Sequence, residues 1–254
     1  MKGRNKINAQ LVQSEIANNP WIPINYSRLL SDTKIEKASV LIVGANSGYE
    51  ASLFINDGAK KVVGIDVFTP RIMFKHRRYK FVESAAESLP FPDNSFDVVY
   101  SQAVLEHVTD VSLTWKESLR VTKKNGVVTH MASPLWYSRD GHHRPDLFSN
   151  YPWCHVGRDI NQWKIWAEEI KEFRVNLPEI HNAMEYCMNE LNINQKAPKI
   201  YSESLKSLPN TLVIQDTYDL DFDTIPPEVL ERLPVNLSES DLRKITHCGI
   251  VKKL

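Results

Sequence analysis

The chain lacks the cysteine content that marks disulfide-rich or zinc-binding small domains. Only three of its 254 residues are cysteine, Cys154, Cys187 and Cys248, and no Cys-x-x-Cys pair occurs. The sequence therefore indicates neither a disulfide framework nor a zinc knuckle. It also has no internal repeat and no low-complexity segment, so we exclude a solenoid.

An excess of charge of one sign and long apolar runs are absent as well. Lysine plus arginine and aspartate plus glutamate both total 31, so no net positive charge attracts nucleic acid or an anionic membrane. No stretch of about 18 apolar residues is present to span a bilayer, and no apolar segment follows the first basic residues. We expect a cytoplasmic protein with a small or locally recognised substrate and no integral membrane segment.

The apolar residues that are present, 42% of the chain, suffice for one substantial α/β core. Between residues 38 and 131, short runs rich in Val and Ile alternate with helical stretches, which predicts parallel strands with helices on both faces. We expect a doubly wound, mostly parallel sheet. The predicted strands cover residues 39–43, 61–65, 79–82, 96–101 and 126–131, and the predicted helices cover residues 49–57, 70–76 and 111–123.

The pattern changes after residue 131. Residues 132–170 begin with a stretch rich in aromatics, histidine and arginine that has no clear period, and they predict an inserted lid. Residues 171–254 contain further helices and two closing strands that bring the sheet to about seven. We expect one domain over residues 1–254. The later predicted elements are helices at 163–173, 181–191 and 238–242 and strands at 211–214 and 245–253.

One glycine-containing turn carries the first chemical signal. In VLIVGANSGYEA, residues 40–51, a buried strand leads through a turn framed by Gly44 and Gly48 into a helix. Such a turn lets backbone approach a ligand closely, and the helix start offers free N–H groups. Asn46 lies where a left-handed conformation is needed, which asparagine tolerates.

An acid follows the second predicted strand. Asp66 lies 18 residues beyond Gly48, where a carboxylate can accept hydrogen bonds from ribose hydroxyls. A glycine turn alone is commonly just a turn. Together with Asp66 and the adjacent Val67, it predicts a nucleoside site at two neighbouring strand ends.

The segment ESAAESLPFPDNSFDVVYSQAVLEHVTD, residues 83–110, then resembles the class I S-adenosylmethionine-dependent methyltransferases, in the branch with Leu-Pro-Phe before the fourth strand. The resemblance covers about residues 39–131. It implies a Rossmann-like fold with S-adenosylmethionine as cofactor. It also implies that Ala86 and Glu87 border the adenine, that Ser101 and Gln102 face the methionine part, and that His107 packs beneath the cofactor.

Three departures from the family pattern keep an alternative open. Ile42 replaces the acid usual before the first glycine, Asn46 replaces the middle glycine, and Ala85 replaces the acid beside the adenine. A degenerate, non-catalytic binding module is therefore the second hypothesis. A nicotinamide-dependent oxidoreductase is the third, and its fingerprint needs a third glycine where Tyr49 stands.

The stretch after the fifth predicted strand supplies the candidates for acceptor binding. His142, His143 and His155 are candidate general bases for an acceptor hydroxyl, which is a poor nucleophile near neutral pH. The alternative is that the aromatics pack onto the sheet and the histidines cap a turn. Further candidates are aromatic walls and anion partners: Trp136, Tyr137, Phe148, Tyr151, Trp153, Arg139 and Arg144.

The acceptor itself is indicated only by a short resemblance. The Gly-His-His segment is similar to stretches of bacterial methyltransferases associated with surface polysaccharides, which implies O-methylation of a sugar or glycan hydroxyl. A small aromatic or lipid-like acceptor is the alternative. We predict no metal site, because the spacing of Asp140, His142 and His155 matches no compact signature.

Overall fold

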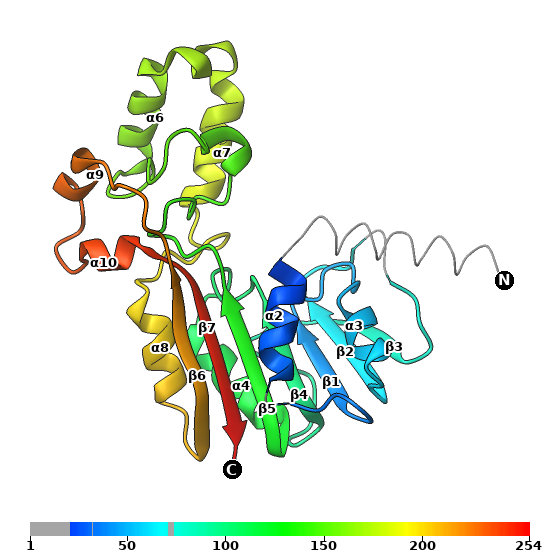
Figure 1. Cartoon of the computed structure of the whole chain (residues 1–254). Helices are drawn as coiled ribbons and strands as arrows, with labels where there is room; N and C mark the ends of the chain where they lie inside the picture. The colour runs from blue at the N-terminus through cyan, green and yellow to red at the C-terminus, as the bar shows by residue number, and fades with distance from the viewer. Residues whose placement is uncertain (1–20, 32, 71–73) are drawn as a thin grey trace.

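A computed structural model describes residues 21–31, 33–70 and 74–254, and its centre is one seven-stranded sheet (Figure 1). The strand order is β3-β2-β1-β4-β5-β7-β6. The first five strands pair in parallel, and β7 runs antiparallel to both β5 and β6. The predicted mostly parallel, doubly wound sheet is confirmed. The strands are β1 (Ser39–Val43), β2 (Lys61–Asp66), β3 (Tyr79–Glu83), β4 (Phe96–Gln102), β5 (Thr122–Ala132), β6 (Thr211–Leu220) and β7 (Lys244–Lys253).

Helices cover both faces of the sheet because its central strands are apolar on both sides. Successive side chains of a strand point to opposite faces, so Val40 and Ile42 pack with α2 (Trp21–Leu30) and α3 (Ala51–Asn56). Leu41 and Val43 belong to the other cluster, with α4 (Val111–Val121) and α8 (Lys199–Lys206). These two layers of apolar contacts form the main core.

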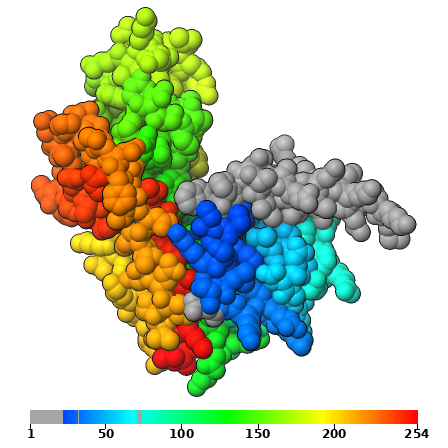
Figure 2. Space-filling view, in the orientation of Figure 1, coloured from blue at the N-terminus to red at the C-terminus, as the bar shows by residue number. Residues whose placement is uncertain are grey.

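The segment between β5 and α8 forms a projection from this body (Figures 1 and 2). It buries an apolar cluster of its own, separate from the clusters on the sheet. Asp159 opens α6 with a capping box, in which its side chain accepts from Gln162 N–H. The elements of the projection are α5 (Pro145–Phe148), α6 (Ile160–Glu169), the 3₁₀ helix η1 (Lys171–Val175) and α7 (Leu177–Met188).

Most predicted elements are present with shifted ends. The predicted helix over 111–123 stops at Val121, because β5 already begins at Thr122, which pairs with Phe96. Strand β6 extends to Leu220, further than its short apolar run indicated. The predicted helix at 70–76 includes residues outside those described. The capped helix near the end is α10 (Glu239–Leu242), and α9 (Pro227–Glu231), α8, α5 and α2 were not predicted.

The three cysteines are free and buried. Among the described residues, no helix is both long enough and apolar enough to cross a bilayer.

Candidate functional site

The turn after β1 has the backbone conformation that its residues predict. Gly44, Asn46 and Gly48 all adopt positive φ angles, of 70°, 42° and 77°. A Cβ on Gly44 would lie 2.1 Å from Cγ2 of Val104, and one on Gly48 would lie 2.3 Å from the hydroxyl of Tyr79. Glycine is therefore required at both ends of the turn for steric as well as conformational reasons.

Asp66 is joined directly to this turn. Its Oδ2 accepts a hydrogen bond from Asn46 N–H at 2.8 Å, and its Oδ1 accepts one from Val67 N–H at 2.8 Å. Strands β1 and β2 are parallel neighbours, so the turn and the acid lie at one edge of the sheet. A carboxylate has about four acceptor positions, which leaves capacity for two hydroxyl donors.

Two apolar side chains next to this carboxylate are exposed. Val67 is 67% exposed and Phe68 is 52% exposed. An exposed apolar pair beside a carboxylate and a glycine turn is what a nucleoside needs, because its base is flat and apolar while its ribose is polar. The arrangement fits an adenosine group between the two strand ends.

The next four candidates make contacts within the protein, and their part in cofactor binding stays a prediction. Ala86 is buried in the apolar cluster that includes α4, and Oε1 of Glu87 accepts from Thr109 N–H at 2.8 Å, which holds the loop before α4. Ser101 is fully buried, and a hydrogen bond of 2.5 Å joins its Oγ to Nδ1 of His130. Gln102 is half-buried and accepts from the hydroxyl of Tyr100 at 3.0 Å. Of these four, Glu87 and Gln102 have partly exposed polar side chains, whereas the side chains of Ala86 and Ser101 are buried.

The three candidate bases differ in burial. His142 and His155 are 0% and 1% exposed, and His143 is half-buried. Burial lowers the pKa of His142 to about 3 and that of His143 to about 4, and it also lowers the pKa of His155 well below its usual value. All three rings are therefore neutral near pH 7. Their role as bases stays a prediction, and of the three only His143 has a side chain that reaches the surface.

His107 is not packed beneath the site as expected. The residue is exposed, its Nδ1 donates to the carbonyl of Asn192 at 2.5 Å, and its ring lies 5.0 Å from that of His143. The reason is that His107 follows β4 in a loop that faces residues 133–143 rather than the sheet core. His107 and His143 thus form a pair of rings between the sheet edge and the projection.

Several aromatic residues of the projection do not line an open site. Trp136, Phe148 and Trp153 are all buried, the first two in the cluster of the projection and the third in a small cluster near α9 and α10. The expectation that they form acceptor walls is wrong for these three. Because the segment folds away from the sheet, it must bury its own apolar surface, and the large rings do so. Tyr137 and Tyr151 remain partly exposed.

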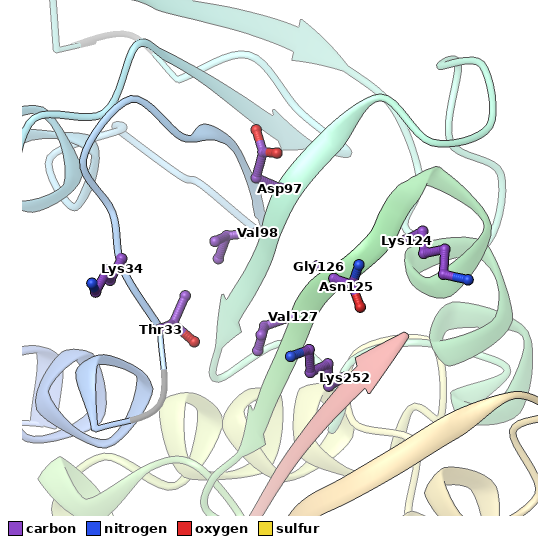
Figure 3. A pocket seen from close by; sticks show the side chains of 9 residues that line it. All are labelled: Thr33, Lys34, Asp97, Val98, Lys124, Asn125, Gly126, Val127 and Lys252. Carbon is purple, nitrogen blue, oxygen red and sulfur yellow. The ribbon is translucent and has the colours of Figure 1, made fainter. Parts of the chain in front are cut away.

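Two cavities lie at opposite edges of the sheet. A cavity of about 390 Å³ is lined by Arg139, Asp140, Phe222 and neighbouring residues, beside the projection. The other, of about 270 Å³, includes Asp97, Gly126 and three lysines (Figure 3). It lies at the amino ends of β4 and β5. Ligands of open parallel sheets bind at the carboxyl ends, so only the first cavity is on the side of the candidate site.

Comparison with known proteins shows which family part of the chain resembles. Residues 41–129 match the family model described as a methyltransferase domain. These residues are a methyltransferase domain. The match indicates S-adenosylmethionine as the cofactor of this domain, and it covers β1 to β5, the part of the chain that contains the glycine turn and Asp66.

Curated relatives match part of the chain. An uncharacterized methyltransferase of Mycolicibacterium gilvum is 32% identical over 127 residues, 47% of this chain and 48% of that protein. The 2-methyl-6-phytyl-1,4-hydroquinone methyltransferase of Synechocystis is 32% identical over 154 residues, 58% of this chain and 46% of that protein. The chain thus spans about half the length of the curated relatives that it matches.

The fold likeness extends further than the sequence likeness. A crystal structure described as an S-adenosylmethionine-dependent methyltransferase from Listeria monocytogenes aligns with a TM-score of 0.56 and 15% identity, over 91% of this chain and 98% of that one. At this identity the likeness concerns the fold. It supports the Rossmann-like description of the methyltransferase domain.

The methyltransferase domain also contains an acid that the sequence analysis missed. Glu50 lies two residues after Gly48, at the start of α3, and its Oε1 accepts from the hydroxyl of Tyr100 at 3.4 Å. Burial raises the pKa of Glu50 to about 7. Ile42, at the position of the usual acid, is fully buried and apolar. The sequence did contain a signal for Glu50, because an acid follows the second glycine of the turn by only two residues.

Proposed function

We propose that this protein is an S-adenosylmethionine-dependent methyltransferase whose cofactor site lies at the carboxyl ends of β1, β2 and β4. The observation that carries the proposal is the hydrogen bond between Asp66 and Asn46 N–H at 2.8 Å. It joins an acid suited to a ribose to a turn whose two glycines leave no room for a Cβ. The exposed Val67 and Phe68 lie beside them.

The residues of the chain act by binding and positioning. Asp66 accepts the ribose hydroxyls, the turn from Gly44 to Gly48 lets the backbone approach the cofactor, and Val67 and Phe68 cover the adenine. When bound, S-adenosylmethionine would supply an electrophilic methyl carbon for attack by an acceptor, with S-adenosylhomocysteine as the leaving group. The contribution of the protein is to hold acceptor and methyl carbon in attack geometry.

We propose a hydroxyl of a sugar or glycan as the acceptor. The cavity beside the projection supports this proposal, because Arg139, Asp140 and Asp221 offer charged hydrogen-bonding groups beside the exposed ring of Phe222. Hydroxyl-rich ligands use such donors and acceptors, and an aromatic face covers their C–H surface. A small aromatic acceptor would need a more apolar cavity.

We assign the role of general base to His143. Its Nε2 donates to the carbonyl of Pro134 at 2.8 Å, so its Nδ1 carries the free electron pair that can accept a proton from an acceptor hydroxyl. Pro134 is the second residue after the end of β5, close to the carboxyl edge. His142 and His155 are too deeply buried for contact with an acceptor in this conformation.

Calorimetry with S-adenosylmethionine and S-adenosylhomocysteine tests the cofactor site. We expect saturable binding by the wild-type chain and an affinity about 10- to 100-fold lower for Asp66→Asn, which corresponds to about 1.4 to 2.8 kcal/mol. Asp93→Asn is the matched control, because Asp93 is an acid that pairs with Arg120 at the opposite edge of the sheet.

The same titration separates the alternatives. Absence of saturable binding by the folded wild-type chain would contradict the proposal and favour the non-catalytic module. Binding of reduced nicotinamide cofactors, with a change in their absorbance, would favour the oxidoreductase instead.

Release of S-adenosylhomocysteine in the presence of sugars and oligosaccharides tests the acceptor. We expect His143→Ala to lower kcat by about 100-fold or more while the cofactor affinity stays unchanged, because a base acts only on the acceptor. Turnover of aromatic acceptors but not of any sugar would show that the sugar assignment is wrong.

A further inference from the structure

Three potential metal ligands meet inside the projection, apart from the cofactor site. The ligand atoms are a ring nitrogen of His142, the Sγ of Cys154 and a ring nitrogen of His155, and all lie within 4.8 Å of one another. All three residues are buried. The segment that carries them connects β5 to α6, so the cluster lies above the carboxyl edge of the sheet (Figure 1).

Two of these atoms have unmet hydrogen-bonding capacity. Among the residues that the structure describes, neither Nε2 of His142 nor Nδ1 of His155 has a hydrogen-bond partner, and both atoms are inaccessible to solvent. Buried polar atoms of native proteins are rarely left without partners. Two such atoms, on histidines that each have a ring nitrogen within 4.8 Å of the same thiol sulfur, indicate a ligand shared by all three residues.

We propose that the projection binds one Zn²⁺ ion through His142 Nε2, Cys154 Sγ and His155 Nδ1. Two imidazoles and a thiolate form a donor set that zinc prefers over calcium or magnesium, which take oxygen ligands. Asp140 is the candidate for the fourth position, since its Oδ1 lies 4.0 Å from His142 Nε2 and its side chain is 40% exposed. Because this carboxylate is partly exposed, a metal ion can reach the site from solvent past Asp140.

The surroundings of His155 already suit a metal ligand. Its Nε2 donates to the carbonyl of Trp136 at 2.5 Å, which leaves the electron pair on Nδ1 directed at the cluster. Ligating histidines typically donate their second N–H to a backbone carbonyl, and this contact fixes the ring.

Of the three proposed ligands, His142 must change its protonation and hydrogen bonding most when the metal binds. Its Nδ1 accepts from Arg144 N–H at 3.0 Å, so the ring proton is on Nε2 before the metal binds. Binding moves this proton to Nδ1 and gives up that hydrogen bond, while the thiol of Cys154 releases its proton to solvent. A tetrahedral zinc ion with bonds of about 2.0 to 2.3 Å holds its ligands about 3.5 Å apart, so the three atoms must approach one another by about 1 Å.

The charge around the cluster suits a thiolate. The guanidinium groups of Arg158 and Arg232 are near Cys154, and Arg158 donates to the carbonyl of Cys154 at 2.5 Å. These cations stabilise the ionised sulfur, and the ionised sulfur with Asp140 balances the two charges of the metal. The ion would tie residues 140–142 to residues 154–155 and so hold the loop that contains His143.

The cluster was not predictable from residue spacing. The spacing of Asp140, His142 and His155 matches no compact signature, so no metal site was predicted, and Cys154 was not among the residues considered for it. Only the fold of the loop brings Cys154 next to His142. The inference concerns a structural ion and does not depend on the proposed methyl transfer.

Metal analysis of the untagged, full-length chain tests the inference. We expect one equivalent of zinc, either as isolated or after loading with ZnCl₂ and removal of excess ion. After exchange, Co²⁺ should give the visible absorption of a tetrahedral site together with a thiolate-to-cobalt charge-transfer band. Cys154→Ser and His155→Gln should lose the bound metal, and the matched control Cys248→Ser, at a buried cysteine of β7, should keep it.

Thermal unfolding gives a second readout. A chelator should lower the unfolding temperature of the wild-type chain and of Cys248→Ser but not that of Cys154→Ser. If a variant does not fold, the cobalt spectrum of the wild type still shows whether the site binds metal through a thiolate. A wild-type chain that binds no stoichiometric zinc after loading, or binds cobalt without the thiolate band, would overturn the proposal.

Discussion

The carboxyl edge of β1 and β2 and the projection between β5 and α8 use polar residues in opposite ways. At the edge, Asp66 and the turn around Asn46 hydrogen-bond to one another and stay accessible, with exposed Val67 and Phe68 alongside. In the projection, His142 and His155 are buried among aromatic rings.

The difference shows which kind of residue can be assigned from a pattern. Residues at strand ends of a parallel sheet face the ligand side because the backbone places them there. Residues of an irregular segment face wherever packing directs them, and here much of the packing directs histidines and tryptophans inward. The following predictions test this separation of the two regions.

The largest effect should follow from removing a ring from the core of the projection. Phe148 is fully buried against Trp163 and Phe173, and Phe148→Ala should lower the free energy of unfolding by about 3 to 5 kcal/mol. Because this cluster is separate from those on the sheet, cofactor affinity by calorimetry should change by less than about threefold. A loss of cofactor binding in the folded variant would show that the two regions are coupled.

The free energy of unfolding should depend on pH through one contact between the two regions. Glu106 follows β4, is fully buried, and its Oε1 accepts from Ser133 N–H at 3.1 Å. Burial raises the pKa of Glu106 from 4.5 to about 8. An acid whose pKa is higher in the folded state stabilises the fold below its unfolded pKa, and this stability is lost as the pH rises through the folded pKa.

We therefore expect the wild type to lose a few kcal/mol of stability between about pH 5 and pH 8 relative to Glu106→Gln. Unfolding midpoints of both proteins across this range measure the difference. Other groups titrate in the same window, but they are common to both proteins and cancel. Parallel pH profiles would mean that Glu106 ionises without cost.

A smaller effect should come from the apolar surface beside Asp66. Val67→Ser should weaken cofactor binding about fivefold, or about 1 kcal/mol, because one apolar contact is lost. Stability should not change, since Val67 is 67% exposed. The matched control Val175→Ser, at an exposed position of η1 in the projection, should change neither quantity.

An effect of similarly small size concerns the backbone of the glycine turn. Asn46 has a φ of 42°, a conformation that costs alanine about 1 kcal/mol. Asn46→Ala should be less stable than the wild type by about that amount in urea unfolding, and Asn46→Gly should differ by only a few tenths of a kcal/mol. Equal stabilities of the two variants would indicate that the turn changes conformation readily.

Much of the domain of residues 38–131 followed from the sequence alone. Runs of Val and Ile predicted the parallel strands, and two glycines with Asp66 predicted which strand ends come together. These features depend on contacts and conformations that are local or set by the period of a strand, so residue types and spacing suffice to specify them.

Only the tertiary structure decided the positions of side chains that depend on distant parts of the chain. Ser101 turns inward because His130 lies on the next strand, Glu50 at the start of α3 meets Tyr100 of β4, and Cys154 comes to lie beside His142 through the fold of an irregular loop. Burial of such groups is set by the packing of the whole region rather than by their neighbours in sequence. The sequence by itself specified the cofactor edge, and the fold specified the interior of the projection.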